Sequence, residues 1–390
     1  MSTLHQSGIG ADRRAAGALA VLRLVHEQPG ISRARVAELL GLSSSSTTEI
    51  TARLRARSLV AEHAPEQAGR RGRPSGLLLP DPNGPVVLAV EIAHPRWRVA
   101  AVELGGRTVE STVGRRARDP KPALAEVRGA LTEMQRSFGE RVAAIGVSVT
   151  ATVSGTTLVQ AATFPWGEVD LRELVPRALR GLPFAAGNDA TLAGLAEARR
   201  GAAAGIGVVL YLAVEVGIGG VLVVDGQPIE GSRGEGGEFG HMPFGDLRLR
   251  CPCGATGCWD LEVDGRALAR LLGRRTPADP RGFATRTLAA AASGGADEAR
   301  AVRTVAAALG RGTGALVNAL DPELVVYGGL APEIHRLAAV ELDNAFEAAL
   351  MEHRRRQAPP IASSALGDDA ALLGAAEQAF DLVLTPALVT

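Results

Sequence analysis

The sequence has very little cysteine, and what it has is confined to one place. Only three of the 390 residues are cysteines, and Cys251, Cys253 and Cys258 all fall within the eight-residue stretch CPCGATGC. An odd number of cysteines, in a chain predicted to be cytoplasmic, argues against a disulfide framework.

The chain also lacks long apolar runs. Its N-terminus has no apolar signal-peptide region, and its apolar stretches are broken by Gly, Asp, Glu or Arg before they reach the length of a bilayer span. We therefore expect a cytoplasmic protein with no membrane partner. A hydrophobic content of 46% and a charged content of 22% are ordinary for a soluble globular protein, and the length allows two or three domains.

Net charge is absent overall but is unevenly distributed. Residues 1–83 contain 11 arginines and 7 acidic residues, whereas residues 84–390 contain 31 basic and 35 acidic residues. A basic head on an acidic body indicates that the head meets a polyanion. The bias is small, so composition alone does not decide the function.

The cysteine stretch itself has the spacing of a metal site. Cys-x-Cys followed by a third cysteine five residues later, among Gly254 and Gly257, is typical of a tight loop that turns several sulfurs inward. Zinc usually takes four ligands, and His241 in GEFGHMPF is the nearest candidate for the fourth. The alternative is one or two buried thiols, but the spacing favours a structural Cys₃His zinc site.

The first 80 residues have the pattern of a winged helix-turn-helix. Residues 11–27 carry apolar side chains at helical spacing. Ser32 can cap a short helix that Gly41 ends, and Ser43 can cap a third helix. Helix, short helix, glycine turn and helix predict a helix-turn-helix, whose second helix of the pair enters the major groove. An ordinary three-helix bundle with a serine-rich surface is the alternative.

The start of that third helix supplies the candidate groove contacts. The predicted DNA-facing residues are Ser44, Ser45, Ser46 and Thr48, with Arg53 placed further along the helix for phosphates. Short hydroxyl side chains can reach phosphates or bases without obstructing the approach of the helix.

A β-hairpin after the third helix matches the wing. Residues 59–62 and 76–79 are predicted strands, and the tip between them carries Arg70, Arg71 and Arg73 among Gly and Pro. A thin cationic segment of this kind can lie along phosphates or enter a narrow minor groove. This position, directly after a helix-turn-helix, favours DNA over a merely solvated charge run.

From residue 86 the periodicity becomes that of an α/β domain, in which strands alternate with helices. The expected strands are 86–92, 97–104, 142–149, two strands around a glycine bend in 207–226, and 323–329. The expected helices are 121–138, 168–180, 189–202, 263–273, 297–320, 333–354 and 369–382.

Several stretches of this body together resemble the ROK family of bacterial sugar kinases and transcriptional repressors. They are GNDATLAGLAEARRG, VGIGGVLVVDGQPIEGSRGEGGEFGH, CPCGATGCWD, ALVNALDPELVVYGGLAPE and DDAALLGAA. The resemblance implies a two-lobed actin-like, ribonuclease-H-like fold with a ligand cleft between the lobes. We therefore predict a winged helix-turn-helix at 1–80 and a ROK effector-binding domain at 81–390, whose C-terminal helix returns to the first lobe. A winged helix in front of the body is the family's regulator arrangement.

The resemblance also implies roles for particular residues. His241, Cys251, Cys253 and Cys258 match the family's ligands of a structural zinc. The implied effector contacts are Asn188, Asp189, Glu238, His241 and Asp260, where the family usually has Glu in place of Asp260. In family kinases the residue matching Asp189 is the base that accepts the proton of the sugar hydroxyl. The alternatives are a helix cap for Asp189 and a surface acid for Glu238.

Two phosphate-binding loops depart from the kinase pattern, and we assign no catalytic residues. Family kinases have Asp-x-Gly-x-Thr where this chain has Glu91, Ala93 and Pro95, and Gly-Thr-Gly where it has Glu215-Val216-Gly217. Pro95 removes an amide donor, and the glutamate at 215 would repel a triphosphate. The chain is therefore predicted not to be an enzyme.

The predicted function is a repressor that binds double-stranded operator DNA as a homodimer or homotetramer. A sugar or sugar-derived effector in the cleft would change the geometry between the two heads. Two other classes stay open: a sugar kinase with a DNA-binding head, and a regulator controlled by a protein partner whose sugar site is vestigial.

Overall fold

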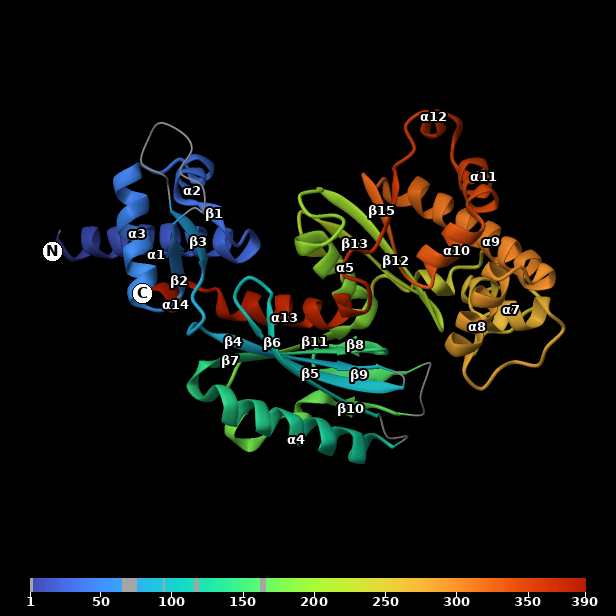
Figure 1. The fold of residues 1–390 in the computed structure, drawn as a ribbon, viewed down its shortest axis with the longest axis horizontal. Helices are drawn as coiled ribbons and strands as arrows, with labels where there is room; N and C mark the ends of the chain where they lie inside the picture. Colours follow the sequence, from blue (N-terminus) through green and yellow to red (C-terminus); the bar gives the residue numbers. More distant parts are fainter. Residues whose placement is uncertain (1–2, 65–75, 94, 116–118, 162–165) are drawn as a thin grey trace. The chain divides into compact units, whose positions relative to one another are not determined.

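The computed structural model describes residues 3–64, 76–93, 95–115, 119–161 and 166–390, with the backbone alone described for residues 3–13 (Figure 1). The chain forms two compact units. Unit 1 comprises Met1–Ser148, Asp170–Ala186 and Ala375–Thr390, and unit 2 comprises Val149–Val169 and Gly187–Gly374. The predicted domain boundary at residues 80 and 81 lies inside unit 1 and stays a prediction.

The head has the topology of a winged helix. Its elements are α1 (Thr3–Glu27), β1 (Ile31–Ser32), α2 (Arg33–Leu40), α3 (Ser44–Ala56), β2 (Val60–His63) and β3 (Leu77–Pro80). The predicted caps are confirmed: the Ser32 side chain accepts from the Arg35 N–H, the Ser43 side chain accepts from the Ser46 N–H, and Gly41 ends α2 at φ 61°. The sheet order is β1-β3-β2, so the wing hairpin gains a third strand that the sequence did not predict.

The remainder of unit 1 is built on a five-stranded sheet of order β11-β7-β4-β5-β6. Its strands are β4 (Val86–Ile92), β5 (Arg96–Glu103), β6 (Thr108–Arg115), β7 (Val142–Val149) and β11 (Phe184–Asn188), the last of which continues into unit 2. The helical elements are α4 (Pro120–Phe138), η1 (Gly139–Arg141), η2 (Leu171–Leu174), η3 (Arg177–Leu179), α13 (Ala370–Val383) and α14 (Pro386–Val389).

Helices cover both faces of this sheet. Helix α4 packs against β4 and β5, and α13 crosses the other face (Figure 1). A Cβ at Gly146 in β7 would lie 1.9 Å from the carbonyl oxygen of Ala375, so the glycine is what lets α13 approach the strand so closely. Every residue of β4 is buried, Glu91 included, as expected for a strand whose other residues are all apolar.

Unit 2 contains a second five-stranded sheet, of order β14-β13-β12-β15-β16, and the small sheet β10-β9-β8. The strands are β8 (Thr152–Ser154), β9 (Thr157–Gln160), β10 (Val169–Asp170), β12 (Val208–Glu215), β13 (Gly217–Val224), β14 (Gln227–Pro228), β15 (Leu324–Gly329) and β16 (Ile361–Ser363). The helices are α5 (Asp189–Arg200), η4 (Phe239–His241), α6 (Asp260–Val263), α7 (Gly265–Leu271), α8 (Pro280–Ala292), α9 (Ala296–Leu320), α10 (Ala331–Leu337), α11 (Ala339–Ala349), α12 (Glu352–Arg355) and η5 (Gly367–Asp369).

The side chains of β12 alternate between two cores. Leu210, Leu212 and Val214 join the core formed with α9, α10 and α11. Tyr211 and its alternate neighbours join a separate core formed with α5. The period of two in burial shows that helices cover both faces of this central strand.

Three predicted helices differ from those observed. Residues 168–180 form the short strand β10 and the 3₁₀ turns η2 and η3 in place of a helix, and Pro176 interrupts the segment. The predicted helix 263–273 becomes α6 and α7, since Asp264 is extended at φ −104° and ψ −170° and caps α7. The predicted helix 333–354 divides into α10, α11 and α12.

Among the helices that the structure describes, none combines the length and the apolar character that a bilayer crossing requires.

Candidate functional site

The four predicted zinc ligands lie together. The Nδ1 or Nε2 atom of His241 and the sulfurs of Cys251, Cys253 and Cys258 lie within 4.8 Å of one another. The Cys253 and Cys258 sulfurs are 3.6 Å apart, and the Cys251 sulfur is 3.8 Å from Nδ1 of His241. Zn–S bonds of about 2.3 Å in a tetrahedral site place sulfurs roughly 3.8 Å apart, so the donor set fits a closed four-ligand ion.

A short loop brings the sulfurs together. The Cys251 N–H donates to the Ala255 carbonyl, and the Gly254 N–H donates back to the Cys251 carbonyl. Gly254 at φ +99° and Gly257 at φ +73° take backbone conformations that other residues rarely adopt. Burial, together with the neighbouring sulfurs, raises the pKa of Cys258 to about 12. A bound cation would relieve that penalty by neutralising the thiolates.

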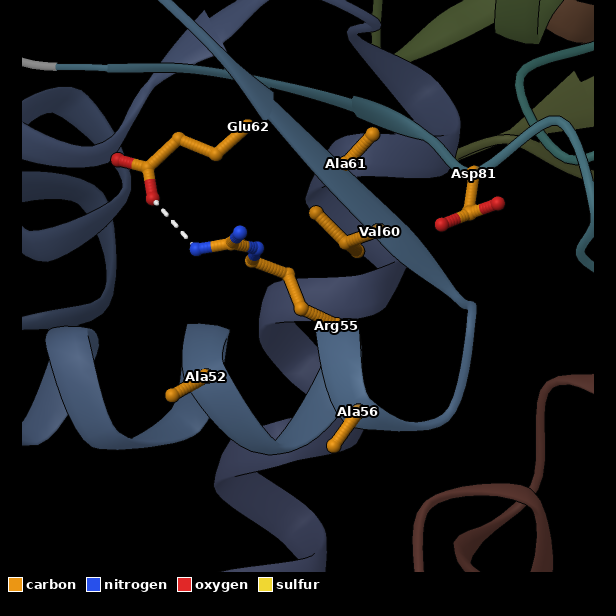
Figure 2. A pocket seen from close by; sticks show the side chains of 7 residues that line it. All are labelled: Ala52, Arg55, Ala56, Val60, Ala61, Glu62 and Asp81. Carbon is orange, nitrogen blue, oxygen red and sulfur yellow. Dashed lines mark ion pairs between the residues drawn. The ribbon is translucent and has the colours of Figure 1, made fainter.

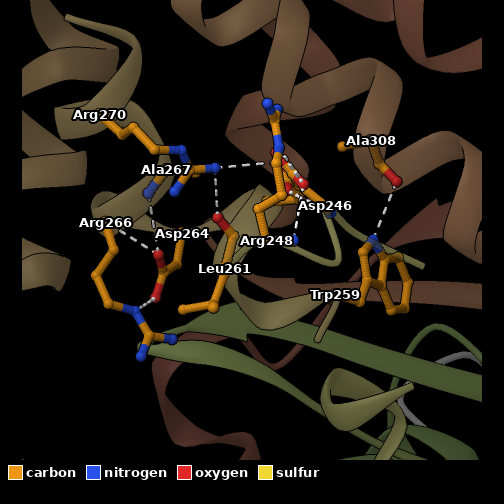
Figure 3. A network of polar contacts seen from close by, with 10 residues as sticks. Asp246, Arg248, Trp259, Leu261, Asp264, Arg266, Ala267, Arg270 and Ala308 are labelled. Atoms are coloured by element: carbon orange, nitrogen blue, oxygen red, sulfur yellow. Dashed lines mark hydrogen bonds and ion pairs between the residues drawn. The ribbon is translucent and has the colours of Figure 1, made fainter. Parts of the chain in front are cut away.

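Trp259 fixes this loop to the core of unit 2. Its side chain is fully buried, and its indole N–H donates to the Ala308 carbonyl of α9 at 3.0 Å (Figure 3). A Cβ at Gly312 would lie 2.2 Å from the indole ring, so the absence of a side chain at this position of α9 makes room for the ring. The residue after the last cysteine is therefore a packing anchor.

Ionic contacts hold the segment after the loop (Figure 3). Buried Asp264 caps α7 through the Arg266 N–H and accepts from Nε of Arg266 at 2.6 Å. Nη2 of Arg270 donates to the Leu261 carbonyl at 2.9 Å. Before the loop, the exposed guanidinium of Arg248 lowers the pKa of Asp246 to about 2. The segment after the metal loop is thus held by hydrogen bonds that need no metal.

The effector candidates Asn188 and Asp189 lie at the start of α5. The Asn188 side chain caps the helix by accepting from the Ala190 and Thr191 N–H groups, and its Nδ2 donates to the Ala151 carbonyl at 3.1 Å. The carboxylate of Asp189 accepts from the Ala190 N–H at 2.9 Å and is half-buried. Asn188 is therefore the helix cap, which leaves Asp189 as the carboxylate of this turn.

Glu238 lies between two other polar side chains of unit 2. Its Oε1 accepts from the Thr152 hydroxyl at 3.2 Å, and its Oε2 is 3.8 Å from Nε2 of His241. Because Nδ1 of His241 faces Cys251, the imidazole presents its other nitrogen to Glu238. Sequence reasoning missed Thr152; the only signal for it was a hydroxyl residue closely following a buried strand.

Asp260 has a different environment from the other candidates. It is 8% exposed, and its Oδ1 accepts from the Ile218 N–H at 2.7 Å, while Oδ2 is 3.6 Å from Nδ1 of His241. A Cβ at Gly240 would lie 2.0 Å from Oδ1. Burial raises the pKa of Asp260. The structure thus brings Asp260 to His241 and to the start of β13, as a buried acceptor of a backbone N–H.

Both glutamates at the altered phosphate loops are paired with arginines. In unit 1, Oε2 of Glu91 lies 2.5 Å from Nε of Arg98, its cross-strand neighbour. In unit 2, Glu215 at the end of β12 pairs with Arg281, whose Nη2 also lies 3.8 Å from Asp368. A Cβ at Gly329 would lie 2.6 Å from Oε1 of Glu215, so the Glu215 carboxylate lies against the Gly328–Gly329 turn.

The predicted DNA-facing side chains lie on the first turns of α3. Ser44, Ser45 and Thr48 are exposed, and Ser46 is half-buried. The hydroxyls of Ser45 and Ser46 lie within hydrogen-bond distance of the capping Ser43 hydroxyl. The predicted wing residues Arg70, Arg71 and Arg73 lie outside the described residues.

The other end of α3 borders a pocket of about 500 Å³ (Figure 2). It is lined by Ala52, Arg55, Ala56, Val60, Ala61, Glu62 and Asp81. Glu62 neutralises the local arginines, being 3.6 Å from Nη1 of Arg55 and 3.0 Å from Nη1 of Arg33. With two carboxylates, those of Glu62 and Asp81, among its lining residues, the pocket is a poor phosphate site. Arg53 makes no ion pair within the part of the chain that the structure describes.

The chain is similar in sequence both to sugar kinases and to repressors. A glucokinase of Streptomyces coelicolor is 28% identical over 258 residues, which cover 62% of this chain and 81% of the glucokinase. A xylose repressor of Caldicellulosiruptor bescii is 24% identical over 332 residues, which cover 80% of this chain and 82% of the repressor.

A solved structure supports the fold over nearly the whole chain. It is the crystal structure of a ROK family transcriptional regulator, a homologue of the E. coli MLC protein, with a TM-score of 0.76 at 22% identity. It covers 96% of this chain and 99% of that one. The fold is therefore a winged helix-turn-helix followed by an actin-like body, and because residues 87–381 match the ROK family, the chain belongs to that family.

Proposed function

We propose that this protein is a transcriptional regulator, and a repressor, that binds operator DNA through its head and a sugar or sugar derivative through unit 2. The observation that carries the proposal is the joining of two parts in one chain. A winged helix with exposed hydroxyls at the start of α3 precedes a body that shares its family with sugar kinases. The aligned xylose repressor extends further over this chain than the aligned glucokinase, which agrees with a regulator.

The sugar site is proposed at Asp189, Glu238 and His241, with Asn188 holding the turn that presents Asp189. These side chains offer carboxylates and an imidazole nitrogen, which suit the vicinal hydroxyls of a sugar. The contacts from Thr152 to Glu238 and from Glu238 to His241 support this grouping. Asp260 is proposed to act indirectly, by orienting His241 and the start of β13.

Zinc bound by His241 and the three cysteines is proposed to be structural. Four protein ligands leave no open coordination position for a reacting water. When bound, the ion would fix the loop, and His241 would then hold its free nitrogen toward Glu238. The protein's own hydrogen bonds through Trp259 and Asp264 orient the same loop from its far side.

The paired glutamates favour a regulator over a kinase. A nucleotide triphosphate needs approachable backbone amides and a metal-binding carboxylate. Here the carboxylate of Glu91 forms an ion pair with Arg98, and the carboxylate of Glu215 forms an ion pair with Arg281. Neither carboxylate is available to a magnesium ion without breaking an ion pair.

DNA binding is tested with a labelled duplex from the region upstream of the protein's own gene. We expect saturable binding, with an association constant whose logarithm falls linearly with the logarithm of the salt concentration. We expect Arg71→Ala to reduce the magnitude of that slope by about 1. Arg248→Ala, which removes an arginine that is 90% exposed in unit 2, is the matched control and should leave the slope unchanged. A chain that retains no duplex would refute the proposal, and an unchanged slope for Arg71→Ala would exclude the wing.

The kinase alternative is supported by one observation, the retention of Asp189 at the start of α5. It is tested by measuring ADP formation with ATP, magnesium and either D-glucose or D-xylose. We expect no ADP above the sugar-free background. Sugar-dependent turnover would replace the regulator proposal with a kinase that carries a DNA-binding head.

A further inference from the structure

A buried histidine joins the head to two elements of the body in unit 1. His26, in the last turn of α1, is 3% exposed, and its Nε2 lies 3.3 Å from Oε2 of Glu377 in α13, which is 2% exposed. The Gly105 N–H, at the turn between β5 and β6, donates to Nδ1 of His26 at 3.0 Å. The Phe380 ring lies 4.7 Å from the imidazole, centroid to centroid.

These contacts fix the proton on the imidazole. A backbone N–H can only donate, so Nδ1 of His26 must present its lone pair to Gly105. The ring proton is then on Nε2, where it is donated to the carboxylate of Glu377. A single side chain of the head thus hydrogen-bonds the β5–β6 turn and the C-terminal helix at once.

Other contacts tie the C-terminal segment to the head. Nη2 of Arg23 in α1 donates to the Leu384 carbonyl at 3.2 Å. Arg57, directly after α3, donates to the Thr390 carbonyl. Helix α14 also packs against α1. The segment from Glu377 onward therefore contacts both the first helix of the head and the residue that ends its recognition helix.

The beginning of the same helix belongs to unit 2. A Cβ at Gly374 would lie 1.9 Å from the Leu192 carbonyl oxygen, so α13 touches the first turn of α5 directly. Ala370 lies in the core beneath α5 together with Ala193. The first residue of α5 is Asp189, one turn before that contact.

Less than one helical turn separates the two sets of contacts. Glu377 lies three positions after Gly374, which corresponds to about 4.5 Å along an α-helix. A helix cannot absorb a displacement over so short a distance without losing its internal hydrogen bonds. A shift of α13 at the α5 contact can therefore reach Glu377 and His26.

From this arrangement we infer that α13 carries the state of the sugar site to the head, and that the His26–Glu377 contact is the joint through which it acts. The inference rests on the proposed function, because it assumes that the turn at Asp189 responds to a ligand and that the head binds DNA. His26 and Glu377 are positioning residues, which touch neither ligand.

Coupling between sites is reciprocal, so DNA itself can serve as the probe. The experiment measures hydrogen–deuterium exchange in the zinc-loaded full chain, with and without the duplex from its own upstream region. In the unsubstituted protein we expect DNA to change amide exchange by about twofold or more in residues 189–192 and 370–377, as well as in α3. Unchanged exchange in those two segments, with DNA bound, would overturn the inference.

Two variants distinguish a loss of coupling between α5 and the head from a loss of folding. The double variant His26→Leu/Glu377→Leu removes both polar partners together, so that neither is left as an unpaired buried charge. It should still bind the duplex while losing the exchange change in residues 189–192. Glu377→Gln keeps an acceptor for Nε2 of His26 and should retain the change, and thermal unfolding checks that each variant folds.

His335→Gln is the matched control, because His335 pairs with Asp343 at 3.0 Å in unit 2, and it should behave as the unsubstituted protein does. A double variant that keeps the change in residues 189–192 would refute the role of the His26–Glu377 contact. If no form binds the duplex, the proposed function fails and the inference falls with it.

Discussion

Cys253 is the exposed cysteine of the proposed zinc site, whereas Cys251 and Cys258 are buried. We expect Cys253→Ser to abolish stoichiometric zinc, because a hydroxyl is a much poorer zinc ligand than a thiolate. Since 1 kcal/mol shifts the unfolding midpoint of a unit of this size by about 2–4 °C, we expect the midpoint to fall by ~5 °C or more. Metal analysis and calorimetry of the purified variant measure both effects.

The exposure of Cys253 makes this test specific to the metal. Replacing an exposed sulfur by oxygen leaves no cavity in the core, so a loss of stability reports the lost ion. Ser154→Ala, which removes a half-buried hydroxyl that donates to the Arg233 carbonyl elsewhere in unit 2, is the control and should keep one zinc per chain. A Cys253→Ser protein that still carries one zinc per chain would remove Cys253 from the ligand set.

Substitution of Asp189 distinguishes a sugar-binding carboxylate from a carboxylate that only stabilises the start of α5. Asp189→Asn keeps the shape of the side chain and removes its charge, so we expect it to abolish stabilisation by a sugar that stabilises the unsubstituted protein. D-glucose and D-xylose are the probes, and the shift of the unfolding midpoint is the measurement. DNA affinity without sugar should stay unchanged.

A helix-cap role for Asp189 predicts something different. Loss of a negative charge in the first turn of a helix costs about 0.3–1 kcal/mol whether or not sugar is present. Asp297→Asn makes the same change in the first turn of α9 and calibrates that cost. If Asp189→Asn keeps the full sugar response, the carboxylate is only part of the helix end.

The sequence predicts the metal donors better than the polar contacts around them. His241 and the three cysteines are close in sequence, so spacing alone brings them together. Asp260 accepts from the N–H of Ile218, 42 residues away, and no local pattern shows that its carboxylate is buried. The pairing of Glu215 with Arg281 likewise depends on how α8 packs, which sequence spacing does not encode.

At the scale of elements, the proposed DNA contacts lie at the start of α3. The Ser43 hydroxyl accepts from the Ser46 N–H at 3.0 Å and so orders the turn that carries the DNA-facing residues. Ser43→Ala should destabilise the head by about 1 kcal/mol, the usual cost of losing an N-cap. We also expect weaker operator binding, measured by anisotropy, because part of the binding energy must then order the turn.

The control for that prediction is another serine at a helix end. The Ser293 hydroxyl donates to the Ala289 carbonyl at the end of α8, in unit 2, and Ser293→Ala should leave operator affinity unchanged. Full affinity for Ser43→Ala would mean that DNA does not contact the first turn of α3.

Elements with strong local signals are those that the sequence predicts. The buried run of β4 and the glycine bend between β12 and β13 match the prediction to the residue or nearly so. Helix α8 was not predicted, because its alanine-rich sequence has little amphipathic contrast and its N-cap Asp279 stands in a loop-like TPADP stretch. Strand β1 has only two residues and exists because β3 pairs with it.

At the scale of the whole molecule, the composition of the C-terminal segment does not show which parts of the chain this segment contacts. Helix α13 begins in unit 2 and ends in unit 1, next to the head. A ligand can shift an equilibrium only through contacts that differ between two states, and a continuous element such as α13 can carry such a difference from one unit to the other. The apolar sequence of α13 predicts a helix, whereas only the structure shows that His26 contacts it.

The predicted homodimer or homotetramer makes a prediction about the operator. When two chains associate through their bodies, their two heads bind half-sites on the same face of the DNA. The half-site centres must then lie about one helical turn, 10–10.5 bp, or a multiple of it apart.

Inserting about 5 bp between the half-sites rotates one of them to the opposite face. We expect that insertion to weaken binding at least tenfold and an insertion of a full turn to restore part of it, since the faces align again while the distance differs. Gel-shift titration of the three duplexes measures the effect, and sedimentation of the complex gives its stoichiometry. Equal affinity for all three duplexes would show that each head binds alone, and a ligand could then not regulate the protein by changing the distance between heads.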